Sequence, residues 1–223
     1  SWDAEVDFDT KIIEATAVLR IDREEDADSL WLDINGLDIV EVTYSSGASA
    51  PFSIGSHDPI IGAPLRISLE EQTSEISIVY RTAPEAAALQ WLKPQQTADK
   101  NSPFLFTQSQ AILARSWVPI QDSPGIRFTY DAKVRVPSGL LALMSAENPQ
   151  TLSENGEYEF SMEQPTPAYL LALAVGDLRY EAIGPRSGVY AEPSVLDTAA
   201  YEFGELEQMI DAAEALYGPY RWG

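Results

Sequence analysis

Apolar and polar residues alternate along the first third of the chain. Apolar side chains recur at every second position between residues 13 and 21, and segments 30–34, 65–69 and 76–80 repeat this spacing. Because successive side chains of a β-strand point to opposite faces, a period of two places one apolar face on a core. Several such segments in succession predict an antiparallel β architecture.

A turn signal divides two of these segments. The dipeptide Asn35-Gly36 directly follows the predicted strand at 30–34, and the mainly apolar residues 39–44 come next. Asn-Gly favours the tight turn of a β-hairpin. We therefore expect residues 39–44 to form the return strand of a hairpin.

The middle of the chain departs from this pattern before strands resume. Residues 82–103 show no periodicity and contain three prolines, so we predict a long loop with one turn of helix. Alternation returns at 128–136, and segments 140–144 and 158–162 predict further strands. Residues 169–175 are continuously apolar, which is typical of a strand buried on both faces.

The spacing becomes helical near residue 197. Apolar residues then recur every three or four positions, at Phe203, Leu206, Ile210, Ala213 and Tyr217. We predict one helix here, capped at its start by Asp197 or Thr198. Gly218-Pro219 is a typical helix end.

Charge narrows the range of partners. The 223 residues include 35 acidic and 14 basic side chains, a formal charge of -21, with Glu24-Glu25-Asp26 as the densest acidic run. Such a chain repels nucleic acid and anionic lipid, so neither nucleic acid nor a membrane is an expected partner. The longest apolar run, 168–176, is far shorter than the ~20 residues that span a bilayer.

Catalytic chemistry is sparse. The chain has no cysteine and one histidine, His57, and the H-E-x-x-H and G-x-S-x-G patterns are absent. Catalytic zinc needs three protein ligands, so His57 beside Asp58 is better interpreted as a surface loop residue. The sequence predicts no catalytic residue and no metal site within these 223 residues.

One polar pair is unusual for a plain scaffold. Gln108 and Gln110 lie two positions apart within segment 104–111, so in a strand both would share a face. An amide both donates and accepts hydrogen bonds, which suits binding a peptide backbone or terminus. The alternative is that both side chains cap neighbouring loops or face water.

The same region carries a resemblance to a known family. The matching segments are 88–97, 103–111, 121–124, 128–130, 141–146, 169–176, 183–186, 200–203 and 218–220. Together they closely resemble zinc aminopeptidases of the aminopeptidase N clan, in the branch of leukotriene hydrolase and its bacterial relatives. The resemblance spans most of the chain.

The resemblance implies a fold and a domain division. Residues 1–176 would form a mainly β, saddle-like antiparallel domain, and residues 177–223 the helical opening of a thermolysin-like α/β catalytic domain. The chain is then expected to end before the zinc site. Zinc would belong to the full-length protein, with none in this fragment.

The resemblance also implies a function. The full-length protein would hydrolyse amino-terminal residues from peptides, and this domain would supply one wall of the substrate cleft. Gln110, Ala111 and Gln108 are the implied substrate-binding residues. Peptide substrate and the catalytic domain of the same chain are the implied partners, whereas the fragment alone is expected to be inactive.

Other questions stay open at this point. We expect Arg115 and Asp122 to form a structural pair or to anchor loops rather than take part in chemistry. A stand-alone β binding module without catalysis is the alternative function. The resemblance does not decide between a cytoplasmic and a periplasmic location, and it does not indicate which residue is removed from the peptide.

Overall fold

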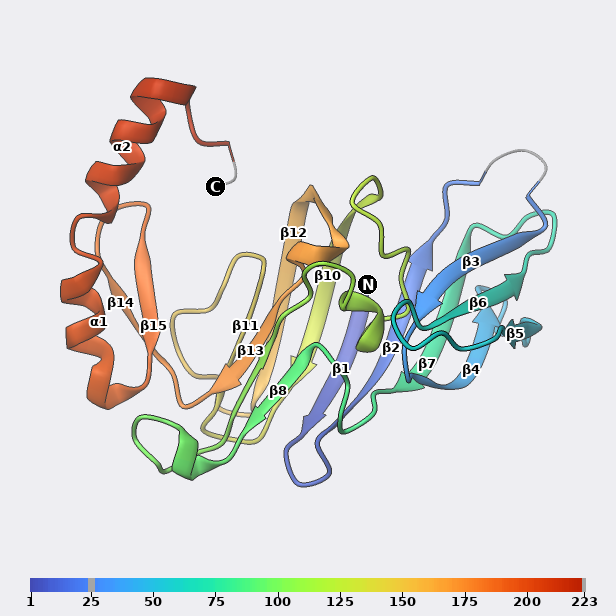
Figure 1. The fold of residues 1–223 in the computed structure, drawn as a ribbon, viewed down its shortest axis with the longest axis horizontal. Helices are drawn as coiled ribbons and strands as arrows, with labels where there is room; N and C mark the ends of the chain where they lie inside the picture. Colours follow the sequence, from blue (N-terminus) through green and yellow to red (C-terminus); the bar gives the residue numbers. More distant parts are fainter. Residues whose placement is uncertain (24–26, 222–223) are drawn as a thin grey trace.

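The computed structural model describes residues 1–23 and 27–221. The acidic run Glu24-Glu25-Asp26 and the last residues, Trp222-Gly223, lie outside the described residues. β-Sheets form the body of the molecule. Residues 179–217, which contain both α-helices, lie at one end (Figure 1), and we call this segment the helical limb. The expected mainly β, largely antiparallel architecture is confirmed.

The largest sheet runs through the centre of the body in Figure 1 and has the strand order β12-β10-β1-β2-β7-β4. Its strands are β1 (Trp2–Asp7), β2 (Ile12–Arg20), β4 (Asp38–Tyr44), β7 (Glu75–Arg81), β10 (Arg127–Arg135) and β12 (Glu157–Pro167). β1 and β10 are parallel, and the other neighbours are antiparallel. In β1, β2, β7 and β10 buried positions recur at every second residue, as the alternation predicts.

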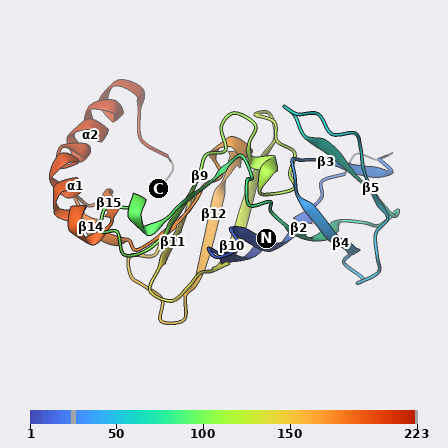
Figure 2. The ribbon, with the colours of Figure 1, turned by 60° about the horizontal axis from the view of Figure 1, so that its bottom comes forward.

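Two smaller sheets flank this sheet. A three-stranded sheet consists of β3 (Ser29–Ile34), β6 (Ala63–Ser68) and β5 (Phe52–Ile54). A four-stranded sheet consists of β11 (Leu141–Met144), β13 (Leu173–Gly176), β9 (Phe104–Thr107) and β8 (Leu89–Leu92). Figures 1 and 2 both place the three-stranded sheet at the end of the molecule opposite the helices.

The predicted hairpin at Asn35-Gly36 is wrong. β3 pairs with β6, whereas β4 pairs with β7 in the large sheet. Gly36 has a φ of 75°, as a tight turn requires, but the backbone NH of Asn35 donates to the Arg115 carbonyl at 2.8 Å. Long-range contacts therefore separate the two strands, although Gly36 has the positive φ that the Asn-Gly signal implies.

Short elements account for the other differences in the β body. The predicted loop 82–103 contains the expected turn of helix, η1 (Pro94–Gln96), but also strand β8, which pairs with β9. The predicted strand 169–175 is only half right, because a 3₁₀ turn, η3 (Ala168–Leu170), precedes β13. Strands of four residues leave too few alternating positions to show a period.

The single predicted helix is two helices, α1 (Leu196–Glu202) and α2 (Leu206–Tyr217), separated at Gly204. The predicted caps are wrong: Val195 is the N-cap, without a side-chain cap bond, and Asp197 lies in the first turn. The predicted end at Gly218 is confirmed, with a φ of 91°. A hairpin of β14 (Arg179–Ala182) and β15 (Gly188–Ala191), which the sequence did not predict, contacts α1.

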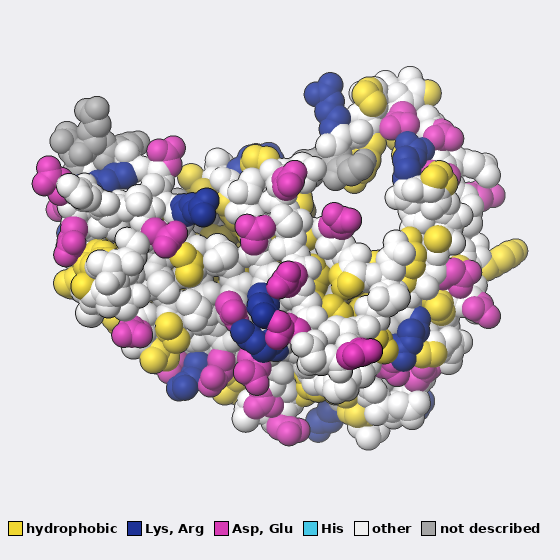
Figure 3. Space-filling model, turned by 180° about the vertical axis from the view of Figure 1, so that it is seen from behind, with side chains coloured by type: hydrophobic (Ala, Val, Ile, Leu, Met, Phe, Trp, Pro, Cys, Tyr) yellow, Lys and Arg dark blue, Asp and Glu magenta, His cyan; other side chains and the backbone are white. Residues whose placement is uncertain are grey.

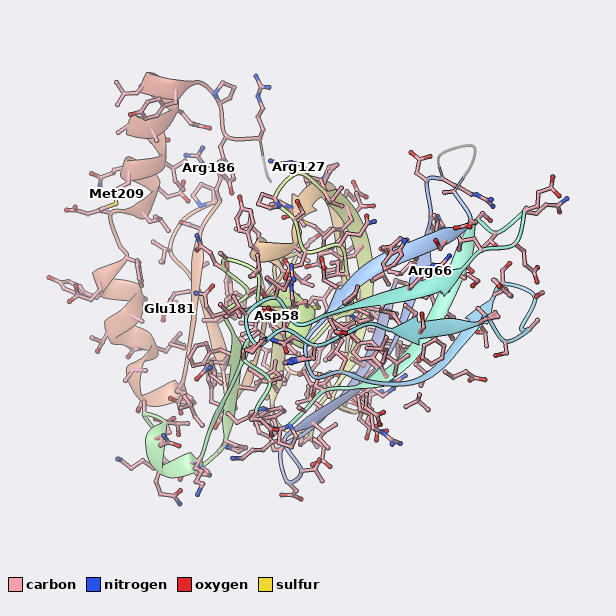
Figure 4. All side chains as sticks on the ribbon, turned by 45° about the vertical axis from the view of Figure 1, so that its right-hand side comes forward. Asp58, Arg66, Arg127, Glu181, Arg186 and Met209 are labelled. Atoms are coloured by element: carbon pink, nitrogen blue, oxygen red, sulfur yellow. The ribbon has the colours of Figure 1, made fainter. Side chains whose placement is uncertain are left out.

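An arginine joins this hairpin to α2. Arg186 lies 3.2 Å from Glu207, 2.7 Å from Asp211 and 3.0 Å from Glu214, measured from guanidinium nitrogens to carboxylate oxygens. A hydrogen bond from Ser187, followed by contacts from Arg186, lowers the pKa of Glu207. Arg186 lies on the inner side of α2 and Met209 on its outer side (Figure 4). A hollow separates this limb from the body (Figure 3).

Candidate functional site

The two candidate glutamines lie in a turn rather than in a strand. β9 ends at Thr107, and residues 110–113 form a turn that leads into a short 3₁₀ helix, η2 (Ala114–Ser116). The two amides therefore do not share a strand face, contrary to the prediction from the sequence spacing. The Gln110–Ala111 peptide bond is cis.

Local hydrogen bonds explain why the strand ends here. The backbone NH of Gln108 donates to the Ala88 carbonyl at 2.9 Å. The side-chain Oε1 of Gln108 then accepts from the backbone NH of Gln110 at 3.0 Å. A side chain that bonds the backbone two residues on favours a turn over a continuing ladder.

Exposure alternates across this turn. Gln108, Gln110 and Ala111 are exposed, whereas Ser109 is 2% exposed. Among the described residues the side-chain amide of Gln110 has no hydrogen-bond partner, while Gln108 spends its Oε1 on the turn. The two amides therefore differ in that only Gln108 uses its side-chain oxygen within the turn.

Ser109 attaches the turn to the core. Its hydroxyl donates to the Leu171 carbonyl at 2.7 Å and accepts from the indole Nε1 of Trp117 at 3.1 Å. Trp117 is fully buried and lies edge-on to Trp2, with ring centroids 5.4 Å apart. The Tyr80 hydroxyl donates to the Trp117 carbonyl at 2.9 Å, and burial raises the pKa of that hydroxyl, which keeps it protonated.

The expected Arg115–Asp122 pair is confirmed. The Arg115 Nε lies 3.2 Å from Asp122 Oδ2, and their side chains are 8% and 2% exposed. The guanidinium also lies 3.5 Å from Asp33 Oδ2 on β3 and donates to the Ile61 carbonyl at 2.6 Å. The loop that carries Ile61 is marked by Asp58 in Figure 4. Arg115 thus connects the end of the glutamine turn to the three-stranded sheet.

The described residues do not fit a zinc ion. His57 is exposed, and its Nε2 lies 3.2 Å from Asn35 Oδ1. Within residues 1–23 and 27–221, no three His, Cys, Asp or Glu side chains come together as a metal site. No chemical step through a metal is therefore assigned to the residues of this chain.

Sequence reasoning missed the residues that hold the turn. Ser109, Trp117 and Leu171 come together across separations of up to 62 positions in the chain. A lone serine between two glutamines carries no signal that it is buried, since serine is usually exposed. Only the fold brings these groups together.

Curated relatives match nearly the whole chain. The leukotriene A-4 hydrolase of Xenopus laevis is 41% identical over 98% of this chain, which spans 37% of that protein. The leucine aminopeptidase 2 of Yarrowia lipolytica is 39% identical over 97% of this chain, which spans 34% of it. The chain therefore corresponds to about a third of the length of these relatives.

Solved structures agree with the sequence relatives. The native leukotriene A4 hydrolase of Saccharomyces cerevisiae superposes with a TM-score of 0.89 at 32% identity, over 99% of this chain and 35% of that one. A yeast leukotriene A4 hydrolase in complex with bestatin gives a TM-score of 0.88 at 34% identity, with the same coverage.

No helix in the described part of the chain is long and apolar enough to cross a membrane.

The family assignment rests on the sequence as well as on the fold. Residues 1–170 match the peptidase M1 N-terminal domain, which is more than half of the chain. This match agrees with the resemblance carried by the glutamine segment and its flanks. The chain belongs to the peptidase M1 N-terminal domain family.

Proposed function

We propose that this chain is the amino-terminal part of a zinc aminopeptidase that removes amino-terminal residues from peptides. In this proposal Gln110, Ala111 and Gln108 line one wall of the substrate cleft. The observation that carries it is the exposed Gln110 side-chain amide, which makes no hydrogen bond within residues 1–23 and 27–221, on a turn that is fixed to the core at Ser109. The hydrolase and aminopeptidase relatives favour this proposal over a stand-alone binding module.

The chemistry of the turn suits a peptide amino terminus. The side-chain carbonyl oxygen of Gln110 can accept a hydrogen bond from an ammonium group, and the side-chain NH₂ group can donate to a peptide carbonyl. Ala111 has a small side chain, so a substrate backbone can approach the main chain beside it. Gln108 contributes mainly by holding the turn, because its Oε1 already accepts from the Gln110 NH. These residues bind and orient the substrate, and none of them is proposed to act in catalysis.

The other parts of the proposal concern the longer protein. We place the domain boundary near Gly176, with residues 177–223 as the opening of the catalytic domain, and the family match ending at residue 170 supports this. The catalytic domain of the same chain would cover exposed apolar residues of the helical limb. We propose that the zinc ion binds in the catalytic domain of the longer protein, since the described residues of this chain form no site for it.

The test uses the zinc-loaded full-length protein and an aminoacyl anilide substrate. Gln110→Ala is expected to raise KM about tenfold, because a hydrogen bond to a charged amine is lost. Gln110→Glu is expected to lower KM, since a carboxylate binds an ammonium group more strongly than an amide does. Inhibition by bestatin, which the yeast relative binds, should weaken in the alanine variant.

The outcomes are easily separated. Thr82→Val serves as a control, because Thr82 is buried directly after β7 and its hydroxyl accepts from the Ile13 NH rather than from the turn. The control should keep the wild-type KM. Unchanged KM and bestatin inhibition in Gln110→Ala would rule out the proposed substrate contact.

A further inference from the structure

We propose that Ser109 is a positioning residue that holds the glutamine turn in its ligand-binding conformation. The inference rests on the proposed function and deepens it, because it assigns a role to a buried residue between the two exposed glutamines. Ser109 does not touch the substrate in this proposal. It acts through Gln110.

The Ser109 hydroxyl donates one hydrogen bond and accepts another, and so connects two segments. The single O–H proton goes to the Leu171 carbonyl at 2.7 Å, and an oxygen lone pair accepts the Trp117 indole NH at 3.1 Å. Leu171 lies directly between η3 and β13, so the turn is fixed to the four-stranded sheet on that side. Because both partner groups are buried, neither has water as a substitute.

The link continues into the centre of the molecule. The Trp2 indole NH donates to the Tyr80 hydroxyl at 2.7 Å, and that hydroxyl donates to the Trp117 carbonyl at 2.9 Å. Trp2 lies on β1 and Tyr80 on β7 of the large sheet. The chain of hydrogen bonds and the rigid Trp117 side chain therefore connect the large sheet to Ser109. These contacts therefore also fix the position of Gln110, the next residue in the chain.

Few other contacts fix the turn. The Gln108 NH bonds the Ala88 carbonyl before the turn. Within the turn, the Gln110 NH bonds the Gln108 Oε1 and the Leu113 NH bonds the Ser109 carbonyl. None of these three contacts ties the middle of the turn to another element. Ser109 is the buried side chain in segment 108–111, so its hydroxyl sets where that segment lies on the core. Loss of the hydroxyl should let Gln110 shift relative to a bound substrate.

The experiment measures KM and kcat of the zinc-loaded full-length protein with an aminoacyl anilide, in four forms: wild type, Ser109→Ala, Gln110→Ala and the double variant. Ser109→Ala is expected to raise KM about fivefold with kcat within about twofold, because misplaced binding groups weaken substrate binding. The decisive result is coupling. In the Ser109→Ala background, Gln110→Ala should raise KM much less than it does in the wild type.

Matched variants separate positioning from stability. Thr82→Val removes another buried hydroxyl, the acceptor of the Ile13 NH, and should leave KM unchanged at a similar loss of thermal stability. Ser109→Cys keeps the size but weakens both hydrogen bonds, so its KM should lie between wild type and Ser109→Ala. It supplies the readout if Ser109→Ala does not fold.

Each outcome decides one question. A wild-type KM in Ser109→Ala or, where that variant does not fold, in Ser109→Cys would overturn the positioning role. Independent, multiplicative effects of Ser109→Ala and Gln110→Ala would overturn it too. A wild-type KM in Gln110→Ala alone would instead contradict the proposed function, whatever Ser109→Ala does.

Discussion

At the scale of single residues, the site depends on polar groups that are buried and fully paired. Arg115 bonds Asp122, Asp33 and the Ile61 carbonyl, and its own backbone carbonyl accepts the Asn35 NH. A charge removed from water is tolerated only when such partners replace its hydration. The sequence indicated the Arg115–Asp122 pair, but Asp33 and Ile61 are distant in the chain and carried no signal. Arg115 therefore joins three segments that only the fold brings together.

Removing one partner of this pair should be costly. Asp122→Asn removes the buried carboxylate beside Arg115 and leaves only the half-exposed Asp33, 3.5 Å away, to balance the guanidinium charge. We expect a loss of about 3 kcal/mol in the free energy of unfolding. Urea unfolding followed by tryptophan fluorescence measures it. Arg81→Met breaks the exposed pair with Glu14 and should cost less than about 1 kcal/mol. Equal losses in the two variants would contradict the structural role of the buried pair.

At the scale of elements, periodicity predicted the long strands but missed two of the short ones, β8 and β14, although the four-residue strand β11 was predicted. β2, β7 and β10 have seven to nine residues and bury alternate positions, so a period of two is visible. β8 and β14 have four residues, which is too few. The sequence likewise singled out Gln110 but not Ser109, because the burial of Ser109 depends on Leu171 and Trp117 from other elements.

Gly62 tests how an element supports the site. It has a φ of 75°, and an added Cβ would overlap the Ile34 carbonyl at the end of β3. Gly62→Ala is expected to destabilise the protein by about 2 kcal/mol and to displace the adjacent Ile61 carbonyl from Arg115. Thermal unfolding measures the first effect. Gly125→Ala is the control, because a Cβ there meets nothing within 4 Å. If Gly62→Ala is as stable as the wild-type protein, the loop adapts to the added Cβ and does not hold Arg115 in place.

At the scale of the whole molecule, the body and the helical limb differ in how they are held. The body has a continuous core of buried side chains from the sheets. In the limb, no residue of α1 or α2 is fully buried by the described residues, although some are partly buried. Arg186 and its three carboxylates join the hairpin to α2, and Glu192 accepts the Ala98 NH of the body at 2.7 Å. These two contacts are polar, and Tyr190 of the hairpin packs against the core. The large apolar side chains in segment 201–217 that are more than half exposed are Tyr201, Phe203, Met209, Leu216 and Tyr217.

This difference predicts where a protease cuts. Tyr201 and Tyr217 are 82% and 86% exposed, so chymotrypsin should cleave this chain first within the limb and leave the body intact. In the full-length protein the proposed catalytic domain covers these residues, and cleavage there should slow at least about tenfold, since protected sites must first open. Mass spectrometry of timed digests identifies the cuts. Trp31, exposed but held in β3, should stay uncut in both proteins. Equally fast cleavage of the limb in both would show that no further domain packs on it, and the assignment of residues 177–223 would fail.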